Sequence, residues 1–390
     1  MSKLLSQGGF GCVFYPGITC KGKTDKSKSY VSKLQIKDET TVNELEISKI
    51  VESIELPSPR YAYIESYCNV DLRTINRDVI SKCDVLSNEK EKYILMRSRY
   101  INDQNFFSSL TSDINIRYVI LQMLETYIFL VSSIKLLVDK RIIHFDLNNN
   151  NIIYSPVLLS PILIDFGISI DMNNFLSEAT VQKGGDLKKT ALLEKRTKFL
   201  KDNFYIYAPD VYIWPLEVHL ICYLVNEADK LTLDSLKAIC SEYVVKNPGF
   251  KIFSEHFKKQ YVVGAVNYYK KFIKKSKDEI IEEFISHWET WDNYALGILN
   301  LRFLRYIFQK SFFENNLIIN LSQIALQNSH YNPNKRQTIE ETLTSLNKVF
   351  YIDSDPDKYI DLVTNITINS DKARTEIKQD KLDVPTSVTK

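Results

Sequence analysis

Residues 143–152 read IHFDLNNNNI, and residues 163–167 read LIDFG. In the first segment, Asp146 can orient a hydroxyl group and accept its proton while that hydroxyl attacks a phosphoryl group. Asn151 and Asp165 supply the hard oxygen atoms that Mg²⁺ prefers as ligands. Both segments lie beside short apolar runs that are typical of strands, which would hold the polar side chains in place. The order and spacing of these groups predict a site for metal-assisted phosphoryl transfer.

A glycine-rich segment opens the chain, with the sequence SQGGFGCV at residues 6–13. Glycines let backbone amides approach a polyphosphate closely, and an aromatic residue at the tip of the turn can cover it. A glycine-rich turn alone is common, so the segments that follow decide its meaning. The residues of this segment that we expect at a nucleotide are Ser6, Gly8, Gly9, Phe10, Gly11 and Val13.

The first hundred residues alternate strand-like runs with turns, and they predict a small sheet whose strands lie at 12–15, 29–34, 61–65 and 92–96. Val31 and Lys33 lie on the second of these strands. A lysine that projects from a sheet beneath a phosphate-covering hairpin can neutralise the α- and β-phosphates. We expect Lys33 in this role, with Lys37 as the alternative.

One helix is expected on this sheet at residues 41–54, with an apolar stripe made of Val42, Leu45, Ile50 and Ile54. An acid on this helix could hold the lysine of the neighbouring strand. We expect that acid to be Glu46, because Ile47 and Ile50 would seat the helix beside the strand. Glu44 is the alternative.

In this order, the segments resemble the motifs of the eukaryotic-type protein kinase superfamily. The resemblance implies an α+β, bilobal protein-kinase-like fold, with a β-rich N-lobe at 1–98 and a helical C-lobe at 99–350. It implies ATP and Mg²⁺ as cofactors and a protein as the substrate. Met96 would guard the adenine pocket, and Ser98 would lie in the hinge at 97–100. The catalytic residues would be Asp146, Lys33, Glu46 and Asn148, and the metal ligands Asn151 and Asp165.

Two later segments extend the resemblance. DNYALG at 292–297 is similar to the buried helix whose aspartate braces the catalytic loop in that family, and NPNKR at 332–336 is similar to its late arginine motif. Arg336 would pair with a glutamate that closes the activation segment. We expect Glu217 of WPLE in that role, with the APD segment at 208–210 as the alternative. The sequence is most similar in style to divergent serine/threonine kinases encoded by large DNA viruses of eukaryotes.

Two residues depart from the family pattern. Phe145 stands where the family usually has an arginine that orders a phosphorylated segment, so we expect activity without phosphorylation of that segment. Asn148 stands where such kinases carry a lysine on the γ-phosphate, and losing that cation would slow the reaction. Two rivals therefore stay open: a nucleotide-binding pseudokinase scaffold, and a small-molecule phosphotransferase that uses a helical insertion at 218–290 as a substrate cap.

That insertion should be anchored by Leu220, Leu224, Leu233, Leu236, Ile239 and Tyr243. Its lysines at 258, 259, 270, 271, 274 and 275 are interpreted as a solvated helix face, with a docking surface as the alternative. Beyond residue 350, the polar segment 351–390 is expected to be a flexible tail.

Composition limits the partners. The chain has 390 residues, 44% of them hydrophobic, and a formal net charge of +2, so we expect neither a nucleic-acid nor a membrane partner. The six cysteines form no C-x-x-C pair, and we expect reduced thiols in an intracellular protein, in host cytoplasm or virion if the protein is viral. We also expect no secretory signal and no transmembrane segment.

Overall fold

The structure is a computed structural model that describes residues 2–9, 11–54, 60–86, 91–101, 104–105, 116–155, 157–158, 160–175, 186–308 and 316–350. The described residues fall into two compact units. Unit 1 takes those within 1–109 and 149–169, and unit 2 takes those within 110–148 and 170–350. Phe10 and the segment 351–390 lie outside the described residues, so the roles expected for them stay predictions.

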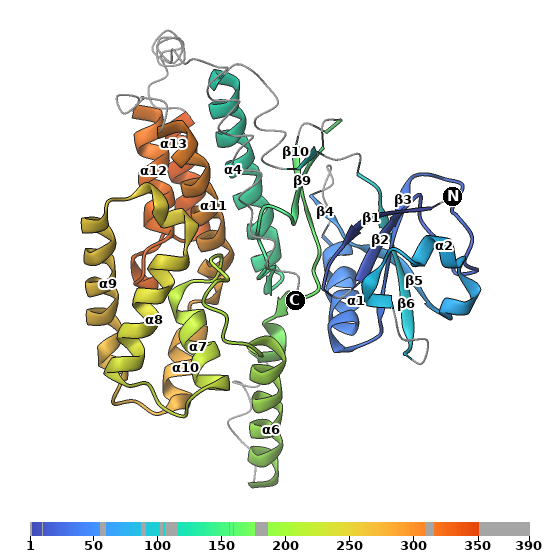
Figure 1. The fold of residues 1–390 in the computed structure, drawn as a ribbon. Coiled ribbons are helices and arrows are strands. Elements are labelled where there is room, and N and C mark those ends of the chain that lie inside the picture. The colour runs from blue at the N-terminus through green and yellow to red at the C-terminus, as the bar shows by residue number, and fades with distance from the viewer. Residues whose placement is uncertain are drawn as a thin grey trace. The chain divides into compact units, whose positions relative to one another are not determined.

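Unit 1 contains a five-stranded antiparallel sheet with the order β1-β2-β3-β6-β5 (Figure 1). Its strands are β1 (Lys3–Gln7), β2 (Gly11–Tyr15), β3 (Tyr30–Ile36), β5 (Ile64–Val70) and β6 (Tyr93–Arg99). β1 and β2 form the glycine-rich hairpin, in which Gly8 N donates a 2.9 Å hydrogen bond to Gly11 O. The predicted strands at 12–15, 29–34 and 92–96 are confirmed, whereas the run at 61–65 is split between two strands.

The register of this sheet brings several predicted nucleotide residues together. Lys33 lies opposite Val13 on β2 and opposite Met96 on β6, and Val31 lies opposite Ser98. Directly opposed residues share a face of a sheet, and so do residues two positions apart on one strand. These five side chains therefore lie on the same face.

The other face of the sheet forms the hydrophobic core of unit 1. Its buried Phe14, Leu34 and Leu95 belong to one cluster with apolar residues of the segment 72–86. That segment consists of η1 (Leu72–Thr74), the short helix α2 (Arg77–Ile80) and η2 (Asp84–Leu86). Each fully buried Phe or Leu side chain stabilises the fold by about 1.5–3 kcal/mol, so the sheet is anchored through this face.

Four of the six cysteines form disulfides in unit 1, namely Cys12–Cys83 and Cys20–Cys68. Cys222 and Cys240, in unit 2, are free and buried. The expectation of six reduced thiols is therefore wrong for four of them. The paired cysteines are 71 and 48 residues apart in the sequence, so only the folded sheet brings them into contact.

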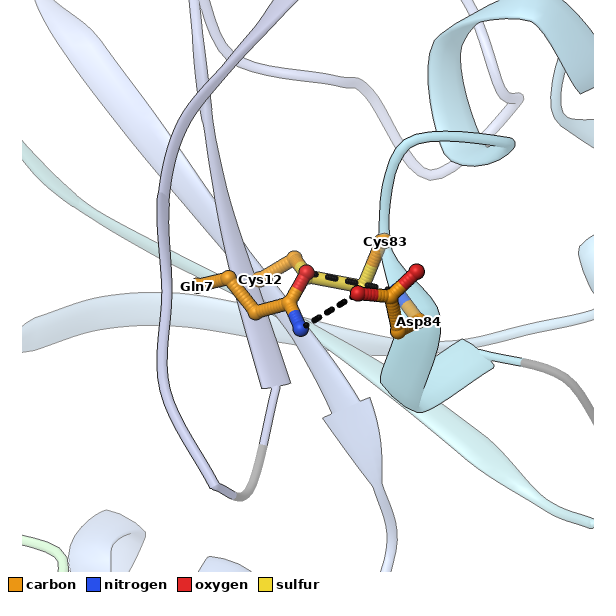
Figure 2. Close-up of a disulfide and its surroundings, with 4 residues drawn as sticks. All are labelled: Gln7, Cys12, Cys83 and Asp84. Atoms are coloured by element: carbon orange, nitrogen blue, oxygen red, sulfur yellow. Dashed lines mark hydrogen bonds between the residues drawn. A yellow bond between two sulfur atoms is a disulfide. The ribbon is translucent and has the colours of Figure 1, made fainter. Parts of the chain in front are cut away.

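The Cys12–Cys83 disulfide attaches the glycine-rich hairpin to the residue just before η2 (Figure 2). Gln7, at the end of β1, lies beside it. Gln7 Nε2 donates to Asp84 Oδ2 at 3.3 Å, and Gln7 Oε1 accepts from Asp84 N at 3.2 Å. The two strands of the hairpin are thus attached to two consecutive residues, β1 to Asp84 and β2 to Cys83.

A second sheet in unit 1 has the order β4-β10-β9-β7. Its strands are β4 (Tyr61–Ala62), β7 (Gln104–Asn105), β9 (Ile152–Ser155) and β10 (Ser160–Ile164). β10 pairs in parallel with β4, and β9 pairs in antiparallel with both β10 and β7. Because of these pairings, residues 149–169 belong to unit 1, which differs from the predicted division of the chain at residue 98.

Helix α1 (Glu39–Glu52) begins after Asp38, whose carboxylate accepts a 2.9 Å hydrogen bond from Thr41 N. Its buried face consists of Thr41, Glu44, Ile47, Ser48 and Val51. The predicted apolar stripe is therefore wrong, and Val42, one of its members, is 44% exposed. Polar residues make up more than half of the true buried face, so a search for hydrophobic periodicity misses it.

Unit 2 is mostly helical (Figure 1). Its helices of nine or more residues are α4 (Ile116–Asp139), α6 (Asp186–Asn203), α7 (Leu216–Asn226), α8 (Leu233–Lys246), α9 (Glu255–Tyr269), α10 (Lys277–Ile285), α11 (Trp291–Phe308), α12 (Asn316–Asn328) and α13 (Ile339–Phe350). Unit 2 also contains the short 3-10 helices η3 (Pro248–Ile252), η4 (Lys270–Phe272), η5 (Trp288–Thr290) and η6 (Pro333–Lys335). The short strands β8 (Ile142–Ile143) and β11 (Ile170–Asp171) pair with each other. The structure is thus mixed α+β, as expected.

The segment 218–290 is helical, as its pattern predicts. Five of the six predicted anchors are buried: Leu220, Leu224, Leu236, Ile239 and Tyr243. Leu233 is 42% exposed, because it is the first residue of α8, next to the capping Thr232, and does not lie on the buried face. Of the six lysines noted there, only Lys258 is half-buried, and the others are exposed. Within the described ranges, no helix is long and apolar enough to cross a membrane.

Candidate active site

Lys33 joins two acidic side chains from separate parts of unit 1. Its Nζ lies 2.9 Å from Glu44 Oε2 and 3.1 Å from Glu44 Oε1. The same Nζ lies 3.1 Å from Asp165 Oδ1. Strand β3, helix α1 and the segment after β10 thus contribute one charged group each, and we call these three residues the charged triad.

The acid that holds Lys33 is Glu44, and the prediction of Glu46 is wrong. Glu46 is exposed, whereas Glu44 lies on the buried face of α1 with Ile47 and Val51. Residues three and seven positions apart share one face of a helix, so Glu44 follows the face that packs inward. The alternative lysine, Lys37, is exposed, and its Nζ donates to Asn69 Oδ1 at 3.2 Å.

The three side chains of the charged triad differ in their exposure to water. The side chains of Lys33 and Glu44 are 16% and 4% exposed, whereas that of Asp165 is 44% exposed. Burial opposes the charge on Lys33, but the carboxylates of Asp165 and Glu44 outweigh this cost and raise its pKa. Lys33 is therefore a permanent cation at neutral pH, and Asp165 connects it to the solvent-accessible part of the site.

The segment that carries Asp165 has a constrained backbone. Asp165 has a φ of +61°, in the left-handed region, which a residue other than glycine rarely adopts. Phe166 is buried, and its ring packs edge-on against Tyr61 at a centroid distance of 6.2 Å. Asn43 of α1 donates from Nδ2 to Ser169 O at 2.8 Å and to Gly167 O at 3.3 Å. Sequence reasoning missed Asn43, although its position next to Glu44 could have suggested it.

Asn151 lies at the same end of the β9–β10 hairpin as Asp165. Ile152 is opposite Leu163, and Ile164 N donates to Asn151 O at 3.1 Å, so Asn151 is beside the residue that precedes Asp165. One carboxylate and one amide oxygen fit Mg²⁺, which is usually held by one or two protein oxygens together with phosphate oxygens and waters. Among the described residues there is no cluster of three or more acidic, His or Cys side chains that could hold a metal ion.

The glycine-rich hairpin has glycines of two kinds. A Cβ at Gly11 would approach Gln35 Cβ and Leu34 O to 2.5 Å each, so the packing of β2 on β3 requires a glycine there. A Cβ at Gly8 or Gly9 would meet no described atom within 4 Å. Packing does not explain these two glycines, whereas close approach of a ligand to the backbone would. Ser6 is exposed on β1.

Strand β6 supplies the residues expected near the adenine. Met96, on β6, is fully buried. Ser98 is half-buried and lies opposite both Val31 on β3 and Ile64 on β5. Arg97, which lies between Met96 and Ser98 in the sequence, forms an ion pair with Asp25, with 2.9 Å between Nη2 and Oδ2. The strand therefore presents Met96 and Ser98 on the same face as Lys33.

The loop that carries Asp146 lies in unit 2 and is bound to α11 through its backbone. His144 N donates to Asp292 Oδ2 at 2.7 Å, and Phe145 N donates to Asp292 Oδ1 at 3.0 Å. Complete burial raises the pKa of Asp292 to about 6, although the two amide donors oppose this change. The bracing aspartate expected at position 292 is thus confirmed.

Asp146 is half-buried and contacts the side chain of Asn148. Asn148 Nδ2 lies 2.8 Å from Asp146 Oδ1, and Asn148 N donates to Asp146 O at 2.8 Å. The amide of Asn148 thus holds the carboxylate of Asp146, a contact that the sequence did not indicate.

Arg336 and Glu217 form the predicted buried ion pair of unit 2. Arg336 Nη2 lies 2.8 Å from Glu217 Oε2, and the two side chains are 1% and 0% exposed. Tyr269 Oη lies 3.1 Å from the same Glu217 oxygen. The alternative, Asp210, is exposed, so Glu217 is the acid that pairs with the late arginine.

Comparison with known proteins finds no family model that matches this chain, and no significant match among curated proteins. The geometry of the residues themselves must therefore carry any assignment of function.

Proposed function

We propose that this chain is an ATP-dependent protein kinase with a bilobal protein-kinase-like fold, which transfers the γ-phosphate of ATP to a serine or threonine hydroxyl of a protein. In this proposal, unit 1 binds the nucleotide and unit 2 supplies the catalytic loop. Helices α7–α10 form the helical insertion of the second lobe.

The observation that carries the proposal is the charged triad. The Nζ atom of Lys33, on a strand, lies 2.9 Å from an oxygen of Glu44 on the neighbouring helix and 3.1 Å from an oxygen of Asp165, the aspartate before Phe-Gly. A structural ion pair would be satisfied by Glu44 alone, whereas Asp165 remains 44% exposed beside the face that carries Val31 and Met96. Such an arrangement suits a site that positions phosphates and neutralises their charge.

Each residue then has a separate role. Lys33 would contact the α- and β-phosphates, and Glu44 would keep its ammonium group in place. The adenine would lie against Val13, Val31 and Met96, with the hinge at Ser98. Asp146 would accept the proton of the attacking hydroxyl, in the orientation given by Asn148. Positioning and charge neutralisation would supply most of the acceleration.

Asp165 and Asn151 would hold Mg²⁺. The ion would neutralise negative charge on the phosphate oxygens as the transfer proceeds. The contribution of the chain is to hold two oxygen ligands at one end of the β9–β10 hairpin, next to the ammonium group of Lys33.

Two measurements test this function. Isothermal titration of the purified chain with ATP and Mg²⁺ should detect binding that Asp165→Asn weakens strongly. Incubation with ATP and a mixture of basic and acidic proteins should then yield phosphoserine or phosphothreonine that mass spectrometry detects. Phosphate on tyrosine alone, or on aminoglycosides or choline and not on proteins, would contradict the proposed substrate.

A nucleotide-binding pseudokinase is the second candidate, and Asn148 is the observation that favours it. One electrostatic contact to the transferred phosphate is worth about 3 kcal/mol, and the side chain at position 148 carries no charge to supply it. Binding of ATP with no transfer to any protein would favour this candidate over the kinase.

A further inference from the structure

Phe145 holds an unusual backbone conformation immediately before Asp146. Its φ is +65°, and its side chain is 4% exposed. A bulky residue adopts this left-handed region only when the surrounding structure imposes it, at a cost of about 1–3 kcal/mol. The contacts that impose it are therefore informative about how the loop keeps Asp146 in place.

Trp214 contacts Phe145 in two ways. The two rings are stacked at a centroid distance of 4.8 Å and an interplanar angle of 24°. In addition, Trp214 Nε1 donates a 2.8 Å hydrogen bond to Phe145 O. This carbonyl belongs to the planar peptide group that joins Phe145 to Asp146. The hydrogen bond from the indole N–H therefore fixes the orientation of the peptide group that precedes Asp146.

Trp214 is itself firmly held. It is 4% exposed and precedes Pro215 and helix α7, whose second residue is Glu217 of the buried pair with Arg336. Asp292 accepts hydrogen bonds from His144 N and Phe145 N, which belong to the two preceding peptide groups. Consecutive peptide groups that lead to Asp146 are thus held by side chains of unit 2, and Trp214 holds the one next to Asp146.

We propose that Trp214 is a positioning residue, which sets the orientation of Asp146 through the Phe145 carbonyl and keeps the loop ordered without a phosphorylated activation segment. This inference rests on the proposed kinase function. A cation at position 145 would order such a segment only after a phosphate had been added, whereas the contact between Phe145 and Trp214 is uncharged and permanent.

The same loop offers a matched control. Trp291 also packs against the Phe145 ring, at 5.9 Å, but its Nε1 is buried without a hydrogen-bond partner among the described residues. Trp214→Phe and Trp291→Phe therefore remove the same atoms from two neighbouring indoles. Only the first change removes the hydrogen bond to Phe145 O.

The test measures kcat and KM for ATP over a range of pH in the full-length protein and both variants. We expect Trp214→Phe to lower kcat about 10-fold to 100-fold, to leave KM for ATP within about twofold, and to shift the acidic limb of the kcat profile. Trp291→Phe should cause a loss at least about tenfold smaller. Equal losses in the two variants, or a rise in KM with kcat unchanged, would overturn the inference.

Hydrogen exchange read by mass spectrometry on peptides that span 142–149 gives a second readout that needs no activity. Trp214→Phe should speed exchange there, and Trp291→Phe should not. Unchanged exchange in Trp214→Phe would count against the positioning role. If the unmodified protein binds ATP but transfers no phosphate, the proposed function fails, whereas the exchange rates still decide whether Trp214 orders the loop.

Discussion

The two units hold their functional side chains by different physical means. In unit 1, Lys33 is held by the opposite charges of Glu44 and Asp165. In unit 2, the backbone before Asp146 is held by an aromatic stack and by hydrogen bonds to Trp214 and Asp292. In the proposed kinase, Lys33 would offer a charge that a nucleotide can engage, whereas Asp146 would need a support that fixes its orientation.

A covalent difference accompanies this contrast, since the disulfides of the described residues all lie in unit 1. Replacing Cys12 and Cys83 together with alanine should lower the free energy of unfolding by about 4 kcal/mol, because the bond closes a long loop in the unfolded chain. Urea denaturation measures the change. A reductant should destabilise the unmodified protein more than the double variant, and equal sensitivity of the two would contradict the Cys12–Cys83 cross-link.

The buried carboxylate of Asp292 should make the support in unit 2 sensitive to pH. The pKa of Asp292 in the folded chain, about 6, lies above its ordinary value of 3.8, so the native state binds this proton more tightly than the unfolded state does. The stability that this group contributes is therefore complete below about pH 4 and is lost as the pH rises through 6.

Urea denaturation between pH 4 and 7 checks this expectation against Asp292→Asn, which does not titrate. As the pH rises, the unfolding free energy of the unmodified protein should fall relative to that of Asp292→Asn, by at most about 3 kcal/mol. A difference that stays constant over this range would show that Asp292 keeps its ordinary pKa.

Changing each of two glutamates of α1 in turn distinguishes the effect of the charged triad from the effect of the overall charge of the helix. Glu44→Gln should lower kcat/KM about 10-fold to 100-fold, because a hydrogen bond between charged groups is worth about 1.5–3 kcal/mol. Glu46→Gln is the matched control, two residues away and exposed, and it should change kcat/KM less than twofold. Similar effects of the two changes on kcat/KM would contradict a specific role of Glu44 in the charged triad.

The smallest effect is expected for the activation segment. Because Phe145 and Trp214 hold the loop without a phosphate, treatment with a phosphatase should change kcat less than twofold. Mass spectrometry before and after treatment verifies that phosphate has been removed. Loss of turnover on treatment would mean that the contacts between Phe145 and Trp214 are not sufficient.

The sequence predicted what depends on short segments. The strands around Lys33, the position of Asp165 after β10 and the brace by Asp292 each follow from a motif together with its apolar neighbours. The pair of Arg336 and Glu217 followed from a family pattern, and the structure confirms it.

Other features depend on contacts that a linear pattern does not contain. Glu44 was passed over because its helix face also carries Thr41 and Ser48, so the hydrophobic stripe indicated the wrong side of α1. The disulfides join cysteines that are 71 and 48 residues apart, so no short cysteine spacing in the sequence predicts them. The hydrogen bond from Trp214 to Phe145 O spans 69 residues and involves a backbone atom, which no residue type reveals.

The central claim is that Asp146 takes part in phosphoryl transfer from ATP. Its most direct test is the transfer of radiolabelled γ-phosphate to protein by the unmodified chain and by Asp146→Asn, with ATP binding measured for both. We predict that Asp146→Asn lowers the transfer rate about 10²-fold to 10⁴-fold while ATP binding changes little. Equal transfer by the two proteins, or binding of ATP with no transfer by either, would contradict the account.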